Sequence, residues 1–428
     1  DMRIAIIGGG AAGVTCAGFL RRPDLWQALQ SDKAQVSDIV ESSVPEVFLF
    51  EKGESLLRKV RATGNGRCNF TNSHVSPAHY TGQSGRQSAH VLEIFPFAAA
   101  LRLFGLLGMP AVTFESGMTY PATLRAETVV NRLSAWLTDA GVHTVCSCGV
   151  QAIHKEGDRF VLRFENGKEQ SFDRVVIATG GSYGIGKKEW SNGYSLAKAL
   201  GHHLTSLHAG MVPLEVEEKA RTSALAGIKM TAALSAQGQQ VTDDLLFTEY
   251  GLSGIGILRL SNRILDAVVT GVLNTSSEQL PTVCVNLLPQ HSVKEWISNA
   301  WQLHARFPSW HVADVLSGML PEAVVRQLAK ECEVDADEAP DKENLERILT
   351  RACAWHFIVR GVHKKDHGHV TCGGVSTDEI DMRSLQSLTC PGLYLIGEVI
   401  DIVGECGGYN LHWAWASAYA AAGALLAE

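Results

Sequence analysis

The chain has 428 residues, 46% of them hydrophobic and 19% charged, and a formal net charge of −8. With a mean hydropathy of +0.03, these values indicate a globular protein of about two or three domains and exclude a disordered chain or a small disulfide-stapled domain. A negative chain gains nothing from counterion release, which argues against nucleic-acid binding. The ten cysteines lack the even spacing of secreted domains and predict reduced thiols in a cytoplasmic protein.

Two stretches, residues 4–20 and 407–427, are apolar enough to raise the question of a membrane span. Three glycines interrupt the first, which also lacks a signal-peptide pattern. The second opens with two glycines and is rich in alanine rather than leucine. Both stretches therefore predict buried core elements, and no membrane partner is expected.

The chain begins with a pattern of strand, tight turn and helix. Residues 3–8 predict a short buried strand, and the alanine-rich residues after the turn predict a helix to about Arg22. The turn at 8–13 reads G-x-G-x-x-G, whose glycines allow a tight turn, the approach of a pyrophosphate and close packing of helix on strand. Residues 47–50 predict a second buried strand, and the carboxylate of Glu51 at its end is placed to bind a ribose diol. Glu51 lies further from the turn than the usual ~20 residues, so a long crossover is expected.

The elements that follow alternate between helices and strands. Residues 126–140 predict an amphipathic helix, while 158–164 and 172–178 predict strands separated by a turn. Near the end of the chain, residues 392–397 predict a buried strand and 410–427 a helix.

The middle of the chain differs in character from both ends. Short strand-like runs fill residues 206–290, and helical patterns fill 291–356, where Ser292 starts a capping box. We therefore expect residues 1–205 and 357–428 to form one α/β domain, interrupted by a β-rich domain at 206–290 and a helical domain at 291–356.

Several further motifs accompany the opening glycine turn: Arg58-Lys59, residues 62–72, Ala178 to Gly181, Leu246 to Gly254, Gly392 to Asp401 and Gly407 to Leu411. Together these motifs resemble those of a bacterial family of NAD(P)/FAD-dependent oxidoreductases. The family includes aminoacetone-oxidase-like flavoproteins and relatives of a flavoprotein of the bile-acid dehydroxylation pathway. They span the chain and imply a two-dinucleotide-binding-type flavoprotein with a Rossmann-like FAD domain built from both chain ends.

The resemblance also implies which residues bind FAD. The amino end of the last helix would stabilise the negative charge that reduced flavin carries. The implied contacts are Gly8, Gly10, Ala11, Ala12 and Gly13 at the pyrophosphate, Glu51 with its neighbour Lys52 at the adenosine ribose, the backbone of Val150 at adenine, Ala178, Thr179 and Gly180 beside the dinucleotide, Lys59, Gly64, Gly66, Arg67 and Cys68 on the ribityl and flavin side, Gly397 and Glu398 near the ribitol, and Gly408, Tyr409, Asn410 and Leu411 at the pyrimidine edge of the flavin.

The function expected is FAD-dependent oxidoreduction of a small organic molecule, with hydride passing between flavin N5 and either NAD(P)H or a substrate carbon. The leading version is a reductase that takes hydride from NADH or NADPH and reduces an unsaturated or steroid-like substrate. No second G-x-G-x-x-G opens a helix, so the nicotinamide nucleotide would bind transiently. The alternative is an aminoacetone-type amine oxidase that uses oxygen. A flavin-containing tRNA-modifying or RNA-binding protein is an alternative of another class.

Three groups of residues each allow a functional and a structural interpretation. Cys68 and Cys406 are better explained as small residues in crowded turns than as redox thiols. Arg67 either binds a phosphate, a cofactor oxygen or an anionic substrate, or bonds the carbonyls of its own turn. The histidines of residues 363–369 have metal-like spacing, but no further ligand cluster accompanies them, so no metal is expected. The residues identify no catalytic acid or base.

Overall fold

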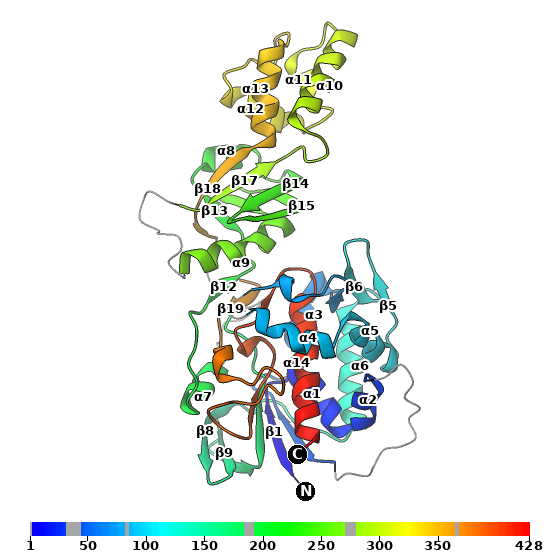
Figure 1. The fold of residues 1–428 in the computed structure, drawn as a ribbon, viewed down its shortest axis with the longest axis vertical. Helices are drawn as coiled ribbons and strands as arrows, with labels where there is room; N and C mark the ends of the chain where they lie inside the picture. Colours follow the sequence, from blue (N-terminus) through cyan, green and yellow to red (C-terminus); the bar gives the residue numbers. More distant parts are fainter. Residues whose placement is uncertain (1, 31–43, 82–84, 184–191, 270–279, 364–367) are drawn as a thin grey trace. The chain divides into compact units, whose positions relative to one another are not determined.

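The chain folds into two units, and the first is built from both of its ends. The computed structural model describes residues 2–30, 44–81, 85–183, 192–269, 280–363 and 368–428. Residues 1–209 and 367–428 form one unit and residues 210–366 the other (Figure 1). The predicted fold class is confirmed: a Rossmann-like domain made from both chain ends, with β-rich and helical insertions between them.

A five-stranded parallel sheet forms the centre of the first unit. Its strand order is β20 (Leu393–Leu395), β11 (Arg174–Ile177), β1 (Arg3–Ile7), β2 (Glu46–Phe50) and β7 (His143–Val145). The register pairs Ile4 with Val47 on one side and with Arg174 on the other. Helices cover both faces of such a sheet, so its strands are runs of apolar residues rather than alternating patterns.

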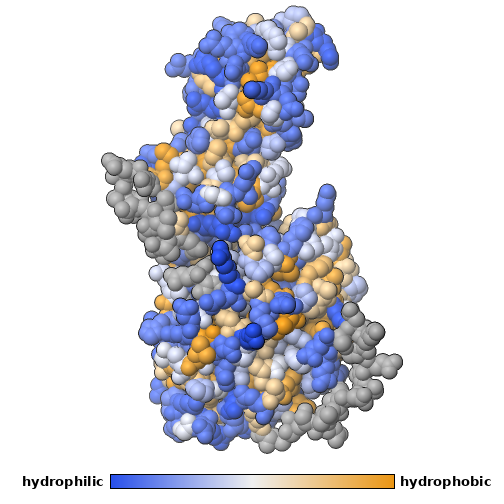
Figure 2. All heavy atoms as spheres, in the orientation of Figure 1, coloured by the Kyte–Doolittle hydropathy of each residue, from blue (hydrophilic) through white to orange (hydrophobic). Residues whose placement is uncertain are grey.

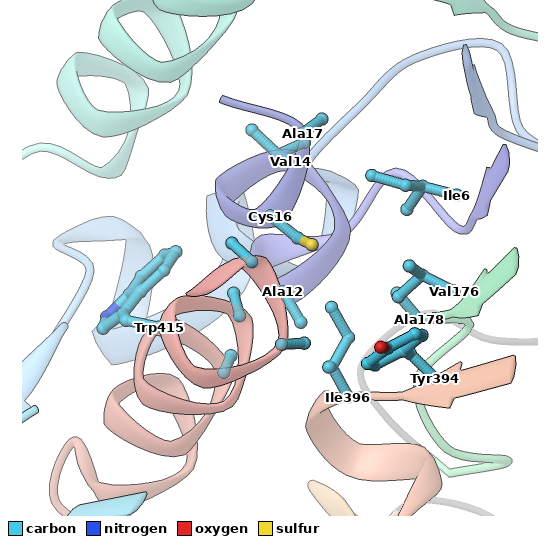
Figure 3. Close-up of a cluster of buried hydrophobic side chains, with 14 of the residues drawn as sticks. Ile6, Ala12, Val14, Cys16, Ala17, Val176, Ala178, Tyr394, Ile396 and Trp415 are labelled. Carbon is cyan, nitrogen blue, oxygen red and sulfur yellow. The ribbon is translucent and has the colours of Figure 1, made fainter. Parts of the chain in front are cut away.

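Two helices from opposite ends of the chain pack along each other against this sheet. Figure 3 shows α1 (Ala11–Arg21) beside α14 (Tyr409–Leu426), with Cys16 and Ala12 between them and side chains from the sheet strands to the right. Glycines on these two helices also let tryptophans of α6 (Ala126–Asp139) and α2 (Pro23–Ala28) pack closely against them. A Cβ on Gly18 would lie 2.5 Å from the ring of Trp136, and one on Gly423 would lie 2.3 Å from Trp26. The helix α14 is apolar around its circumference, because nearly all of it is buried.

Smaller sheets and helices complete the first unit. Three small sheets are antiparallel: β8 (Val150–Glu156), β9 (Arg159–Phe164) and β10 (Glu169–Phe172); β3 (Thr71–Asn72), β6 (Met118–Pro121) and β5 (Ala111–Thr113); and β4 (Tyr80–Thr81) with β21 (Val403–Gly404). A further pair is β12 (His208–Gly210) with β19 (Val370–Cys372). The helices are α2 (Pro23–Ala28), α3 (Arg58–Ala62), α4 (Ala89–Ile94), α5 (Phe97–Leu106), α6 (Ala126–Asp139) and α7 (Gly193–Ala199). The single strand expected at 172–178 is two elements, because β10 ends at Phe172 and β11 begins at Arg174.

The second unit is a closed barrel with a helical insertion. Its strand order is β13 (Leu214–Val216), β16 (Gly251–Ser253), β15 (Gln239–Phe247), β14 (Lys229–Ala236), β17 (Thr282–Asn286) and β18 (Trp355–Val362). The helices are α8 (Lys219–Ala224), α9 (Ile255–Val269), α10 (Val293–Arg306), α11 (Val312–Leu316), α12 (Glu322–Glu331) and α13 (Lys342–Cys353). The capping box predicted at Ser292 starts α10. The 15-residue helix α9 was not expected in the β-rich region.

The boundaries of this unit differ from those expected from the sequence. The chain returns to the first unit after residue 366 rather than at 357, because residues 355–362 form β18, which pairs with β13 and β17. The other boundary lies after residue 209 rather than 205. The barrel and the helices also share one hydrophobic core, so the two insertions expected separately form a single unit.

An ion pair fastens the helical insertion to the barrel. Arg221 of α8 donates from Nε to Glu331 of α12 at 2.6 Å and from Nη1 to the carbonyl of His356 at 2.7 Å. Its guanidinium also lies 5.0 Å from the ring centre of Trp355, which donates to the same carboxylate at 3.1 Å. Burial alone would raise the pKa of Glu331, but hydrogen bonds from Gln327 and Arg221 outweigh it and hold the pKa below its ordinary value.

The distribution of apolar residues bears on whether the chain could cross a membrane. The face shown in Figure 2 is mostly hydrophilic, with apolar residues gathered mainly over the first unit. Within the described residues, no single helix is both long and apolar enough to cross a membrane. One bent pair of helical segments, Gly85–Ile94 with Phe97–Leu106, is long and apolar enough to span a membrane when the two are taken together, by length and composition only.

The Arg221–Glu331 pair predicts a stability effect. Glu331→Gln leaves the Arg221 charge without its partner, and we expect the free energy of unfolding to fall by about 2 kcal/mol. This is below the ~3–5 kcal/mol that breaking a fully buried pair costs, because both side chains keep some contact with water. Thermal unfolding of the full chain, followed by tryptophan fluorescence, measures the loss.

Glu322→Gln is the matched control on the same helix. Glu322 pairs with Arg326 on the surface, where its side chain is 62% exposed, so its loss should cost less than about 0.5 kcal/mol. Equal effects of the two substitutions would show that the Glu331 pair does not fasten the insertion.

A second prediction concerns His412, which is fully buried in α14. Its Nδ1 lies 2.8 Å from Thr71 Oγ1 and its Nε2 lies 2.9 Å from the carbonyl oxygen of Phe95. Burial lowers its pKa to about 4 from the ordinary 6.5. The unfolded chain therefore binds more protons than the folded chain between these values, and stability falls as pH falls from 6.5 towards 4. The loss in the free energy of unfolding reaches on the order of 3 kcal/mol by pH 4.

His412→Gln should flatten this pH dependence, because it removes the titrating group. Denaturation midpoints of both proteins from pH 7.5 to 4.5 measure the slope. His154→Gln, at a side chain 52% exposed, is the control and should keep the wild-type slope. A His412→Gln chain with an unchanged slope would contradict the prediction.

Candidate active site

Four groups of the predicted cofactor residues, Gly8–Gly13, Glu51, Ala178–Gly180 and Gly397–Glu398, follow the carboxyl ends of β1, β2, β11 and β20. All four strands are parallel, so their carboxyl ends lie at one edge of the sheet. The strand that carries the glycine turn, β1, has β2 on one side and β11 on the other. The order of connections reverses at β1, and such a switch point is where open α/β sheets bind their ligands.

Steric contacts explain the glycines of the turn. Gly8 has a φ of +113°, and a Cβ on it would lie 2.3 Å from the carbonyl oxygen of Ala178. A Cβ on Gly13 would lie 1.9 Å from the carbonyl oxygen of Gly8, whereas nothing lies within 4 Å of one on Gly10. Only glycine fits at Gly8 and Gly13, and Gly10 borders the open space where a pyrophosphate would lie.

The amino end of α1 is suited to bind an anion. The helix begins at Ala11 and Ala12, has no acidic residue in its first turn and has no side-chain cap at Gly10. Its first amides are therefore left for a phosphate, and the helix dipole favours a negative charge there.

Glu51 reaches the glycine turn despite the long crossover. Its Oε2 accepts from the amide of Gly9 at 2.7 Å, and its Oε1 accepts from the amide of Gly53 at 2.6 Å. Two amide donors fix the carboxylate beside the turn, where a ribose is expected. Lys52 lies apart from this contact, with its Nζ 3.6 Å from Glu165. The carbonyl of Val150, which begins β8, accepts from the side chain of Asn192.

Lys59 and Glu398, separated by most of the chain, form an ion pair of 2.7 Å. The same carboxylate accepts from the amide of Gly181 at 3.2 Å and from the amide of Thr371 at 2.9 Å. The structure thus joins α3, the turn after β11 and the turn at Gly397–Val399. Sequence reasoning placed Lys59 and Glu398 on the same side of the cofactor but missed Thr371, which no motif marks.

The turn after β11 contains a buried hydroxyl. Thr179 Oγ1 is buried and has no hydrogen-bond partner among the described residues. A Cβ on Gly193 would lie 1.8 Å from it, so α7 packs closely over this turn, and Gly180 follows with a φ of +71°. An unused hydroxyl at the expected dinucleotide site fits a ligand that supplies the missing partner.

The turn at residues 63–68 is held in an unusual backbone conformation. Gly64, Asn65, Gly66 and Cys68 all have φ between +55° and +77°. The amide of Cys68 closes the turn on the carbonyl of Thr63 at 3.0 Å. Burial raises the pKa of the Cys68 thiol to about 12. The thiol stays protonated at neutral pH, in agreement with the structural interpretation of this residue.

The amino end of α14 presents backbone rather than side chains. Asn410 accepts from the amide of Gly404 and donates to its carbonyl, both at 2.8 Å. The ring of Tyr409 stacks on His79 with centroids 4.5 Å apart. Both side chains are therefore engaged in contacts of their own, and the backbone of residues 408–411 is the part of this helix end expected at a ligand.

A polar cluster away from this edge resembles a hydrolase triad in composition only. His202 Nδ1 lies 3.1 Å from Glu379, and its Nε2 lies 2.7 Å from Ser387 Oγ. The same Oγ accepts from the amides of Thr389 and Cys390, so it serves as a turn cap. Burial lowers the pKa of His202, and the cluster holds the end of α7 to residues 376–390.

The remaining candidates from the sequence have structural contacts. Among the described residues, no group of three or more histidine, cysteine or acidic side chains is placed to hold a metal. The stretch 363–369 lies partly outside the described residues, and its His363 contacts Glu215 at 3.1 Å.

The residues present fit FAD. The glycine turn leaves space for a pyrophosphate, Glu51 lies beside that turn, and Thr179 has an unused hydroxyl. Two helix amino ends without acidic first turns are available for the phosphates and the flavin. The individual contacts stay predictions, and the structure brings four of the predicted groups, Gly8–Gly13, Glu51, Ala178–Gly180 and Gly397–Glu398, to one edge of the sheet.

Comparison with known proteins gives the family. The family described as HI0933-like protein Rossmann domain matches residues 2–424. The chain is 29% identical to the 3-dehydro-bile acid delta(4,6)-reductase of Clostridium scindens, over 98% of each chain. It is 30% identical to the ribosomal RNA dihydrouridine synthase of Haemophilus influenzae, over 97% of this chain and 96% of that one. It is 28% identical to the ribosomal RNA dihydrouridine synthase of Escherichia coli, over 99% of this chain and 97% of that one.

Among solved structures, the 3-ketosteroid-delta4-(5alpha)-dehydrogenase of Rhodococcus jostii RHA1 matches 99% of this chain and 97% of its own, with 13% identity and a TM-score of 0.43. That likeness is too distant to bear on activity. The family match covers nearly the whole chain, and it confirms the resemblance drawn from the motifs. The chain belongs to the HI0933-like protein Rossmann domain family and is an FAD-dependent oxidoreductase.

Proposed function

We propose that the chain is a flavin-dependent reductase that takes hydride from NADH or NADPH and saturates a carbon–carbon double bond conjugated to a carbonyl group. One observation carries the proposal. Relatives that match over nearly the whole chain have names with unrelated substrates, a bile acid and a ribosomal RNA. Both names describe the same chemistry, since a dihydrouridine is a uridine whose conjugated ring double bond has been saturated.

FAD and the protein would have separate roles in this reaction. When bound, FAD supplies hydride at N5, and the protein supplies binding, orientation and electrostatics. The amides of Gly10 to Gly13 would bind the pyrophosphate and Glu51 the adenosine ribose. The Lys59–Glu398 pair would orient the ribityl chain, and the amino end of α14 would face the pyrimidine edge of the flavin. Placed there, the dipole of α14 favours the reduced, negatively charged ring.

A small organic substrate suits the charges near the site better than RNA. Four basic residues lie within positions 58–67, and two of them are already neutralised. Lys59 pairs with Glu398 at 2.7 Å and Arg61 with Glu127 at 3.0 Å. Together with the net charge of −8, this leaves little positive surface for a phosphate backbone.

Ribosomal RNA is the second candidate substrate, because two of the relatives carry that name at 30% and 28% identity. The same hydride chemistry would serve either substrate. The two differ in salt dependence, since binding to RNA weakens steeply as salt rises and binding to a neutral enone does not.

An anaerobic titration of the purified flavoprotein with NADH and with NADPH tests the proposal. We expect one nucleotide to bleach the visible flavin absorbance quickly, since a reductase draws its electrons from that source. A 4-en-3-one steroid should then restore the absorbance, with the saturated ketone as product.

The control uses the saturated 3-ketone, which has no double bond to accept hydride and should leave the flavin reduced. Deproteinised ribosomal RNA in place of the steroid tests the second candidate. If neither nucleotide bleaches the flavin but aminoacetone does, and oxygen restores it, the chain is an amine oxidase and the proposal is wrong.

A further inference from the structure

Reduction of a conjugated double bond creates charge at a predictable atom. As hydride arrives at the β-carbon, the electron pair of the double bond moves onto the carbonyl oxygen. A proton from water then adds to the α-carbon, so one nucleotide and one proton are consumed for each saturated bond. A fixed positive charge at the carbonyl oxygen stabilises this transition state more than the ground state.

Arg67 is a suitable source of that charge. It lies in the turn at residues 63–68, is exposed, and has no carboxylate partner among the described residues. Within the described part of the chain, its side chain donates one hydrogen bond, from Nε to the carbonyl of Gly64 at 3.3 Å. That contact leaves the terminal nitrogens of the guanidinium for a ligand. Next to it, Gly66 borders open space, since nothing lies within 4 Å of a Cβ built there.

The ring of Tyr120 supports this arginine. The guanidinium carbon lies 5.0 Å from the centre of the Tyr120 ring, within the range of a cation–π contact. Tyr120 belongs to β6 and is 5% exposed, so the ring is fixed by the fold. Among the residues that the structure describes, its hydroxyl donates to the sulfur of Met118 alone, at 3.7 Å, and sulfur is a weak acceptor.

The same strand borders the amino end of α14. A Cβ on Gly407 would lie 3.9 Å from Met118, and one on Gly408 would lie 2.5 Å from the carbonyl oxygen of Thr71. Thr71 pairs with Thr119 of β6. The turn that holds Arg67 and the helix end expected at the flavin are therefore joined through one small sheet, although their residues lie at opposite ends of the chain.

We propose that Arg67 is a catalytic residue that binds the carbonyl oxygen of the substrate as it becomes negative, and that Tyr120 is the residue that positions it. This inference rests on the proposed function, because it names the group that holds the substrate in that reaction. It assigns to Arg67 a role towards the substrate rather than towards the phosphates of FAD.

The test compares Arg67→Gln with Arg67→Lys in the FAD-loaded enzyme. Reduction of the flavin by the nicotinamide nucleotide should change less than about twofold in both variants. Reoxidation by cyclohex-2-enone should slow about 100-fold in Arg67→Gln, the effect of losing one oxyanion donor, and less in Arg67→Lys. Arg61→Gln, which removes a nearby exposed arginine paired with Glu127, is the control and should retain the wild-type rate.

Binding to the oxidised enzyme gives a second readout that does not depend on turnover. 4-Nitrophenolate carries its charge on the oxygen, whereas 4-nitroanisole is its neutral analogue. Arg67→Gln should weaken the binding of 4-nitrophenolate at least about tenfold, because a charge-assisted hydrogen bond is lost. The affinity for 4-nitroanisole should stay unchanged. Tyr120→Leu should weaken the phenolate as well, while Tyr120→Phe, which keeps the ring, should restore most of the affinity.

The outcomes separate the two proposals. If the wild-type chain reduces no double bond, the proposed function fails, and the phenolate titration still decides whether Arg67 is an anion site. If Arg67→Gln is reoxidised and binds 4-nitrophenolate as the wild type does, the inference about Arg67 is wrong. Release of FAD by Arg67→Gln but not by Arg67→Lys would also overturn it, in favour of a role at the cofactor.

Discussion

The first unit depends on a contact between backbones at the glycine turn. Gly13 approaches the carbonyl of Gly8, and Gly8 approaches the carbonyl of Ala178, so closely that no side chain fits at either glycine. Because of this contact, α1 begins directly at the ends of β1 and β11, and its first amides face the space beside Gly10. A larger residue at Gly13 would push the helix from the sheet and remove the anion site together with the packing.

The packing of α1 passes this constraint on to the other end of the chain. Small residues let α14 lie against α1 (Figure 3), and the turn at Gly397–Val399 links the two helices. The amide of Gly397 donates to Ser417 at 3.0 Å and its carbonyl accepts from Trp413 at 3.1 Å. A Cβ on Gly397 would lie 2.9 Å from that of Ala12. The segment that carries Glu398 is thus fixed by both helices, which explains why the cofactor site needs both ends of the chain.

Features encoded by local patterns could be predicted from the sequence. The strand, turn and helix at residues 3–22 have the periodicity and glycine spacing of a single structural unit, and the structure forms them almost as expected. The capping box at Ser292 was likewise visible from side-chain chemistry alone. By contrast, α9 was missed although Ile257, Leu260 and Ile264, all buried, have helical spacing, because the glycines around them suggested short strands.

Features created by distant contacts could not be predicted. The residues of β18 read as the return to the first domain, and only pairing with β13 and β17 assigns them to the barrel. Similarly, Thr371 and Tyr120 lie in no recognisable motif. They reach the site because β19 carries Thr371 to Glu398 and β6 carries Tyr120 to Arg67. Sequence spacing of this kind holds no information about which strands will meet.

The ionisation of the site favours a substrate that becomes negative. Burial keeps the Cys68 thiol protonated, with a pKa of about 12, and keeps His412 neutral, with a pKa of about 4. The Lys59 charge is cancelled by Glu398, and the Glu51 carboxylate is held by two backbone amides. Arg67 is the charge in this group that no carboxylate of the described residues balances. A guanidinium left in that state beside an aromatic ring attracts electron density that develops on a ligand, whereas an amine substrate that becomes positive on oxidation would be repelled. The same arrangement supports the proposed reduction of a carbonyl-conjugated double bond rather than the oxidation of an amine.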